Sequence, residues 1–160
     1  TRIVVDEDGH AWNIVKCDGE YYYVDATWGD ASYLTDSGNG EALTTINYDY
    51  LCITTDDLSH THIIDNPVRV PNCIVRLDNY YVKEDLYFLT LDTLKLETIF
   101  SGENITQGGS VSIRFANKEV FDEFQTIMLD EQQIFQYIGG STTTLAYTTN
   151  DQLYTYTFMF

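Results

Sequence analysis

Basic residues are scarce in this sequence. It carries 8 Lys and Arg residues against 25 Asp and Glu residues, and its formal net charge is -17. Nucleic-acid binding needs a basic patch that neutralises phosphates, so this charge excludes a nucleic-acid partner. It also argues against docking on an anionic membrane surface. A run of about 18 apolar residues is absent as well, which excludes membrane insertion as a transmembrane helix.

Cysteine is the next scarce residue. The three cysteines, Cys17, Cys52 and Cys73, contain no Cys-x-x-Cys pair, which excludes a zinc knuckle. Their odd number argues against a disulfide framework, and we interpret all three as small apolar side chains. A disulfide between Cys52 and Cys73 in an oxidising compartment stays open.

Proline is scarce too, and its position is informative. Both prolines, Pro67 and Pro71, fall in one irregular stretch, which we take as the boundary between residues 1–66 and residues 70–160. The 160 residues, 44% of them hydrophobic, are enough for one domain or for a domain with a small appendage. Tyrosine is abundant, with 13 residues, and favours β-strands.

The first part of the chain is expected to be rich in antiparallel strands. Two strand-like runs, residues 11–16 and 21–26, flank Asp18-Gly19, and Asp-Gly between such runs predicts a β-hairpin. Two further strands, a loop and a helical turn are expected at residues 1–5, 48–54, 31–47 and 55–58, respectively.

The second part has a different pattern. Short strands are expected at residues 79–82, 86–89, 95–100 and 110–115, with a terminal hairpin at 141–160. Apolar residues recur at helical spacing over residues 117–138, which predicts one long helix. Together the two parts predict an α+β fold, in which an antiparallel sheet is followed by a β-rich extension with one long helix.

The register of the expected hairpin brings a histidine and a carboxylate together. If Asp18 and Gly19 form a two-residue turn, Trp12 lies opposite Asp25. His10 then lies diagonally across from Asp25, within side-chain reach. A carboxylate beside an imidazole fixes its tautomer and stabilises the imidazolium. A solvated surface ion pair gives the same pattern and is the alternative that periodicity alone leaves open.

The residues around this pair resemble a known family. The stretch His10-Ala11-Trp12-Asn13, followed by Val24-Asp25-Ala26-Thr27-Trp28, is similar to the transglutaminase-like superfamily, whose members share a papain-like cysteine-protease core. The resemblance implies that His10 and Asp25 are catalytic residues of a Cys-His-Asp triad and that Trp12 and Trp28 shape the substrate site. It implies that residues 1–66 are the C-terminal half of such a core. The implied activity is acyl transfer or hydrolysis at amide bonds of a peptide or protein substrate, in a bacterial protein that is secreted or at the cell surface.

The nucleophilic cysteine of that family is missing from the pattern. In the family it precedes the histidine, at the start of a helix, and none of the three cysteines has that position. We therefore expect the chain to be a fragment of a longer protein and to be inactive by itself. The hairpin face that carries Trp12, Ile14 and Tyr23 would then be exposed unless something else covers it. We expect it to bind the missing upstream half of the domain or a second copy of the chain, with coverage by the C-terminal extension as the third and least expected outcome.

Two other functions stay open at this point. The chain is alternatively a catalytically inactive transglutaminase-like module with a binding or scaffold role in a secreted or cell-surface protein. A third hypothesis is that residues 70–160 alone carry a binding function. His60, His62 and Asp65 form a His-x-His cluster, but a third ligand is not placed by the pattern, so we predict no metal and no cofactor.

Overall fold

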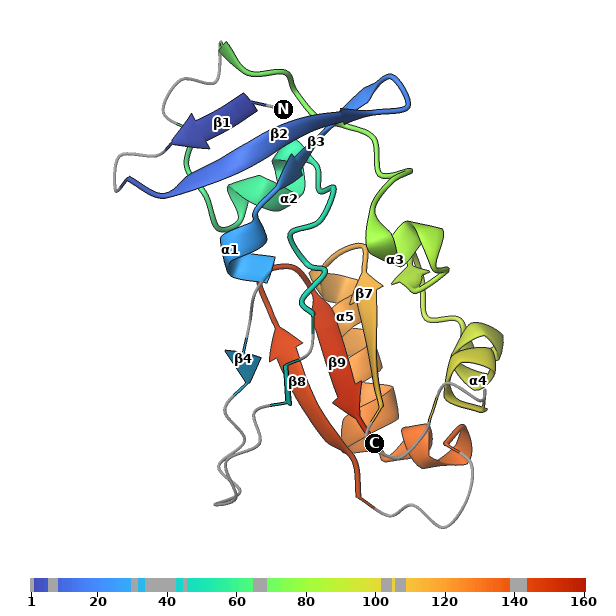
Figure 1. Ribbon diagram of the computed structural model, residues 1–160. Helices are drawn as coiled ribbons and strands as arrows, with labels where there is room; N and C mark the ends of the chain where they lie inside the picture. The colour runs from blue at the N-terminus through green and yellow to red at the C-terminus, as the bar shows by residue number, and fades with distance from the viewer. Residues whose placement is uncertain are drawn as a thin grey trace. The chain divides into compact units, whose positions relative to one another are not determined.

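The computed structural model describes residues 2–5, 9–29, 32–33, 43–44, 46–64, 69–101, 105, 109–138 and 144–160. These residues form an α+β fold, as predicted (Figure 1). The chain divides into two compact units, Thr1–Glu84 and Asp85–Phe160.

The division between the units lies later than the boundary expected between residues 66 and 70. Residues after the prolines hydrogen-bond to the first unit. The Thr55 amide donates to the Cys73 carbonyl at 2.8 Å, and the Asn79 side-chain amide donates to the Leu51 carbonyl at 3.1 Å. These contacts extend the first unit to Glu84.

The first unit is built on a three-stranded antiparallel sheet in the order β1-β2-β3. The strands are Arg2–Val5, Ala11–Cys17 and Glu20–Val24, respectively, so the predicted hairpin is confirmed. A second, short antiparallel pair, β4 (Ser32–Tyr33) and β5 (Leu43–Thr44), lies in the segment that was expected to be a loop.

The strand predicted at residues 48–54 is wrong except at Ile53. Ile53 forms a single antiparallel bridge with Tyr23, in which each backbone amide donates to the other's carbonyl at 3.0 Å. Cys52, directly before it, has a φ of 54°, a left-handed conformation that a regular strand excludes. The segment therefore joins the sheet at one residue.

The face of the hairpin that we expected to be exposed is buried. Trp12 and Tyr23 are 1% and 0% exposed. Ile53 bridges the backbone of Tyr23, and the ring of His62 lies edge-on to the ring of Trp12 at a centroid distance of 4.8 Å. The expectation that this face is exposed is therefore wrong, because a later segment of the same chain covers it. The binding of an upstream half or of a second copy of the chain stays a prediction.

Helix α2 (Thr55–Ser59) is the helical turn expected at residues 55–58. The Thr54 hydroxyl accepts a hydrogen bond from the Asp57 amide, and the Asp57 carboxylate accepts one from the Thr54 amide, each at 3.1 Å. This reciprocal pair is a capping box, which satisfies amides that a helix start leaves without partners. Arg76 donates to the other carboxylate oxygen of Asp57 at 3.0 Å and so holds the start of α2.

Helix α3 (Tyr80–Lys83) replaces the strand predicted at residues 79–82. The Asn79 side chain caps it by accepting a hydrogen bond from the Tyr81 amide at 3.2 Å. The Tyr81 hydroxyl donates to Asp49 at 2.6 Å. A short run of apolar residues does not distinguish a strand from a helical turn, which explains the error.

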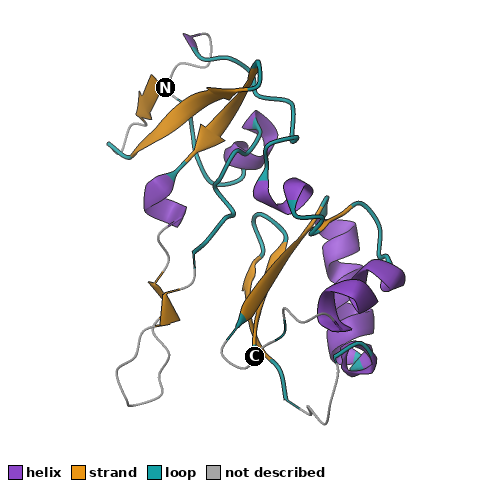
Figure 2. Ribbon diagram, turned by 45° about the vertical axis from the view of Figure 1, so that its right-hand side comes forward, coloured by secondary structure: helices purple, strands orange, loops and turns teal. Residues whose placement is uncertain are grey.

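The second unit is a four-stranded sheet in the order β6-β7-β9-β8, with its helices on one face (Figure 2). β6 (Tyr87–Phe88) and β7 (Ser110–Phe115) run parallel. β8 (Ala146–Asn150) and β9 (Thr155–Met159) form the predicted terminal hairpin. The strand predicted at residues 110–115 is therefore confirmed in full.

One strand prediction in this unit is wrong, and the prediction of a long helix at residues 117–138 is confirmed only in its first part. α4 (Thr93–Ser101) lies where a strand was predicted at residues 95–100. The predicted long helix begins as α5 (Lys118–Phe124) and continues as the π-helical segment η2 (Gln125–Asp130). Gln132 then takes a left-handed φ of 59°, which ends the helix before the 3₁₀ turn η3 (Gln133–Gln136).

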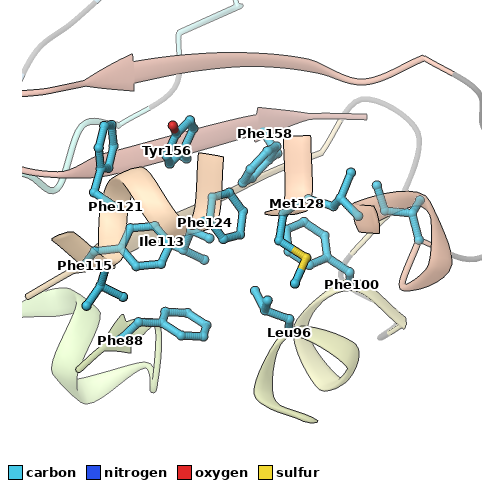
Figure 3. Close-up of a cluster of buried hydrophobic side chains, with 13 residues drawn as sticks. Phe88, Leu96, Phe100, Ile113, Phe115, Phe121, Phe124, Met128, Tyr156 and Phe158 are labelled. Carbon is cyan, nitrogen blue, oxygen red and sulfur yellow. The ribbon is translucent and has the colours of Figure 1, made fainter. Parts of the chain in front are cut away.

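The core of the second unit is largely aromatic. Its buried side chains come from the sheet, α4, α5, η2, η3 and the residues just after η3. Figure 3 labels ten of them: Phe88, Leu96, Phe100, Ile113, Phe115, Phe121, Phe124, Met128, Tyr156 and Phe158. The helical spacing in the sequence thus identified the buried side of this segment, although its second half is not α-helical. None of the helices in the described ranges is long and apolar enough to cross a membrane.

Candidate functional site

The turn of the β2–β3 hairpin sets the register of the site. Asp18 and Gly19 both have positive φ values, 47° and 93°, as a two-residue hairpin turn of the Asp-Gly type requires. Cys17 pairs with Glu20 next to this turn, which confirms the register predicted from the sequence. The candidate site lies at the other, open end of the hairpin.

Asp25 lies directly after β3 and precedes helix α1 (Ala26–Gly29). Its Oδ1 accepts hydrogen bonds from the amides of Thr27 at 2.9 Å and Trp28 at 3.1 Å, so the side chain caps this helical turn. Its backbone amide donates to the Tyr50 carbonyl at 3.1 Å. These contacts fix the carboxylate at the end of the sheet.

His10 contacts the other oxygen of this carboxylate. Its Nε2 lies 2.5 Å from Oδ2 of Asp25, which confirms that the two side chains are within hydrogen-bond reach. Because an ionised carboxylate only accepts hydrogen bonds, His10 carries its proton on Nε2, and Nδ1 is the basic nitrogen of the neutral ring. The His10 side chain is 24% exposed, whereas that of Asp25 is completely buried. A reactant can therefore reach His10 but not Asp25.

A second histidine, His62, contacts the same oxygen. Its Nε2 lies 3.0 Å from Oδ2 of Asp25, and its side chain is 1% exposed. Its Nδ1 lies 2.7 Å from the Thr61 hydroxyl. The amides of Thr61 and His62 both donate to the Leu58 carbonyl at the end of α2. The capped helix therefore positions His62.

The sequence analysis did not assign His62 to this site. It grouped His62 with His60 and Asp65, but His60 is exposed and Asp65 lies outside the described residues. The sequence shows only a histidine that follows a capped helical turn, and this pattern does not predict which residue the histidine contacts. The contact with Asp25 depends on how the segment after β3 returns to the sheet at Ile53, and no spacing rule encodes that return.

The Asp25 carboxylate is ionised although it is buried. Burial raises its pKa, but hydrogen bonds from His10, from the Trp28 amide and from His62 outweigh burial, so the pKa lies below its ordinary value. Each of its oxygens accepts two hydrogen bonds, which together fill the capacity of a carboxylate. A solvated surface ion pair, the alternative left open by periodicity, does not have this burial or this set of donors.

Aromatic rings surround the two histidines. The ring of Trp12 is buried, with centroid distances of 5.8 Å to His10 and 4.8 Å to His62. The ring of Trp28 lies 5.9 Å from that of His10 and 4.6 Å from that of His62, but it is 40% exposed. Trp28 also packs edge-on to Tyr50. Both tryptophans thus lie beside His10. The ring of Trp28 is partly exposed at the surface of the site, and the ring of Trp12 is buried beneath it.

The cluster also contains the atoms that a metal ion would need. His10, Asp25 and His62 each offer one ligand atom, and these atoms lie within 4.8 Å of one another. Two imidazoles and one carboxylate are a common ligand set for transition metals. In the observed arrangement both Nε2 atoms donate to Oδ2, so a metal would have to replace both protons and break both hydrogen bonds. The prediction that the chain binds no metal stays a prediction.

Among the described residues, no cysteine joins this cluster. Cys17 lies at the turn of the hairpin, and the three cysteines are free thiols rather than disulfides. Burial raises the pKa of Cys52 and of Cys73 to about 11. A nucleophilic cysteine needs the opposite shift, so neither thiol is prepared for catalysis.

The comparisons with known proteins do not assign the chain to a family: no protein-family model and no curated protein matches it. The resemblance to the transglutaminase-like superfamily therefore rests on the residues around His10 and Asp25.

Proposed function

We propose that this chain supplies the His and Asp of a Cys-His-Asp triad in a transglutaminase-like cysteine acyltransferase or peptidase that acts on amide bonds. The observation that carries the proposal is the His10–Asp25 pair. It combines an accessible imidazole with a buried, ionised carboxylate that four donors hold in place. Such a carboxylate fixes the tautomer of the imidazole and stabilises its protonated form.

In the proposed reaction, Nδ1 of His10 takes the proton from a cysteine thiol. The thiolate attacks the carbonyl carbon of the amide, and His10, now an imidazolium, gives the proton to the leaving nitrogen as the C–N bond breaks. This leaves a thioester and neutral His10. In the second step His10 takes a proton from water, for hydrolysis, or from an amine, for transfer, and returns it to the departing thiol. Trp28 forms the exposed wall against which the substrate lies.

The described residues contain no cysteine beside His10 and Asp25. We propose that the nucleophile is a cysteine in a segment N-terminal to Thr1, as the family resemblance implies. The chain of 160 residues by itself is then inactive, because a thiolate carries the chemistry. Amidase or amine-incorporation activity of this chain that survives Cys17→Ala would contradict the proposal.

The test uses the protein encoded by the full reading frame and needs no known substrate. A thiol paired with an imidazolium is a thiolate at pH 6, where an ordinary thiol with a pKa of about 8.5 is only roughly 0.3% ionised. We expect one cysteine upstream of Thr1 to react with iodoacetamide at pH 6 at least about tenfold faster than an ordinary thiol. His10→Ala removes this advantage, and the matched control His60→Ala, at an exposed histidine, keeps it.

A second function is favoured by one observation, the lack of a thiol at the site among the described residues. It is a catalytically inactive transglutaminase-like module with a binding or scaffold role. The alkylation experiment decides between the two. A full-length protein in which no cysteine reacts rapidly at pH 6 would contradict the enzyme and favour the module.

A further inference from the structure

We propose that His62 is a positioning residue of the site: its neutral imidazole donates a hydrogen bond from Nε2 to Asp25 and holds the carboxylate in the orientation that His10 requires. The hydrogen bond itself does not depend on the reaction proposed above. Its effect on catalysis does rest on that proposed function.

The carboxylate of Asp25 is held from two sides. Backbone amides of α1 hold Oδ1, while His10 and His62 share Oδ2. Of these donors, His10 is the one that must change its protonation state during acid–base chemistry. Without His62, the only side-chain donor to Oδ2 would be His10, whose protonation changes during the reaction. His62 gives Oδ2 a constant donor, so the carboxylate stays aligned while His10 gains and loses a proton.

Burial determines which histidine a reactant can reach. The side chain of His62 is 1% exposed and that of His10 is 24% exposed, so a thiol can approach the ring of His10 but not that of His62. The Thr61 hydroxyl lies 2.7 Å from Nδ1 of His62 and 3.4 Å from the Leu58 carbonyl, and its one proton goes to the closer acceptor, the lone pair of the neutral ring. Both Nε2 atoms contact the same carboxylate oxygen, so two imidazoliums at this site would repel each other. The proton taken from a thiol is therefore held by His10.

Two substitutions separate a hydrogen-bonding role from simple packing. His62→Gln keeps an N–H donor close to the position of Nε2, whereas His62→Leu fills the space without a donor. In the chain of 160 residues, the 13C resonance of the Asp25 carboxyl reports its pKa, and the 15N resonances of His10 report its tautomer. We expect His62→Leu to raise the pKa of Asp25 toward its ordinary value, because the charged form loses a donor. We also expect it to populate the Nδ1–H tautomer of His10. His62→Gln restores both values.

Several results would overturn the proposal. If the Asp25 pKa and the His10 tautomer are the same in both variants and in the wild type while the melting temperature falls in both variants, His62 only fills space. If one equivalent of Zn²⁺ shifts the Nε2 resonances of both histidines in the wild type, the cluster is a metal site. If His62→Leu does not fold, the 15N resonances of His62 in the wild type test the same idea, since they must show the Nε2–H tautomer that donates to Asp25. A wild-type His62 in the Nδ1–H tautomer would contradict the proposal.

The full-length protein gives the catalytic readout. There, His62→Leu is expected to slow alkylation of the nucleophile at pH 6 by about tenfold, the effect of roughly one lost hydrogen bond, and His62→Gln to restore most of the rate. If no reactive cysteine exists, the proposed function fails, but the resonances of Asp25 and His10 still test the positioning role. An unchanged alkylation rate in His62→Leu, with a reactive cysteine present, would contradict it.

Discussion

Replacing Asp25 tests the site at the residue on which all its contacts converge. Asp25→Asn keeps one carbonyl oxygen, which can still accept from the amides of Thr27 and Trp28. Its NH₂ group, however, faces the Nε2–H groups of His10 and His62. An N–H group then faces another N–H group at each histidine. Both imidazoles must move their proton to Nδ1 so that Nε2 can accept a hydrogen bond from the side-chain amide of the Asp25→Asn variant. Nδ1 of His10 is then no longer basic.

The size of the effect follows from these contacts. Asp25→Asn loses two hydrogen bonds to a charged acceptor, worth about 1.5–3 kcal/mol each, and regains part of that through the tautomer change, so we expect a loss of about 1–3 kcal/mol of stability. Asp25→Ala also removes the helix cap, a further cost of about 1 kcal/mol, and leaves buried donors without partners. In a full-length enzyme, the wrong tautomer is expected to reduce kcat by about 10⁴-fold, as in other His–Asp catalytic pairs.

The pH dependence of the unfolding free energy tests whether Asp25 is ionised in the folded protein. The pKa of Asp25 is lowered in the folded protein, so its ionisation contributes stability that is complete above its ordinary pKa of about 3.9. This contribution is lost as the pH falls through the lower folded-state value. Urea unfolding should therefore show a gap in free energy between wild type and Asp25→Asn at pH 7 that shrinks below about pH 4. A gap that grows in acid, or an Asp25→Ala protein as stable as the wild type at pH 7, would refute the reasoning.

Two further predictions concern the surroundings of the site. In thiol–disulfide exchange with an aromatic disulfide at pH 8, Cys52 and Cys73 should each react about tenfold more slowly than an ordinary exposed thiol. Their pKa of about 11 lowers the thiolate fraction roughly 100-fold, but a thiolate of higher pKa is more nucleophilic, which raises the rate about tenfold again. Exchange rates of single-cysteine variants that match the rate of an ordinary thiol would show that burial does not protect these cysteines. Thr54→Ala should destabilise the protein by about 1–2 kcal/mol by removing the capping box of α2, and Thr54→Ser should restore the stability. If Thr54→Ala leaves the 15N resonances of His62 unchanged, α2 does not position that histidine.

The hairpin shows how much of the site the sequence encodes locally. Asp18 and Gly19 define a turn of known length, and the two-residue period of a strand then fixes which side chains share a face. From these two facts the contact between His10 and Asp25 follows, and the structure confirms it. The α+β class follows from composition and periodicity in the same way.

Long-range geometry explains what the sequence did not provide. His62 reaches Asp25 because the segment after β3 returns to the sheet at Ile53, and one bridge of this kind leaves no periodic signal. The same return covers the hairpin face, which we had expected to be open. The strands predicted at 79–82 and 95–100 failed for another reason. The run at 79–82 is short and apolar, and the run at 95–100 mixes β-branched with charged residues, so neither pattern separates a strand from a helix. At residue 79 the N-cap Asn79 favours the helix.

The gradient of burial across the site supports the proposal that His10 is a general base. From the inside outward, the exposure of the side chain rises from 0% at Asp25 and 1% at His62 to 24% at His10. A charged network that only stabilised the fold would gain from complete burial or from complete solvation, since partial access brings competing water to its strongest hydrogen bond. Here the carboxylate of Asp25 and its donor His62 are buried, and of these three side chains only His10 is accessible to solvent. That is the arrangement a general base requires, because it must exchange a proton with a reactant while its partner does not move.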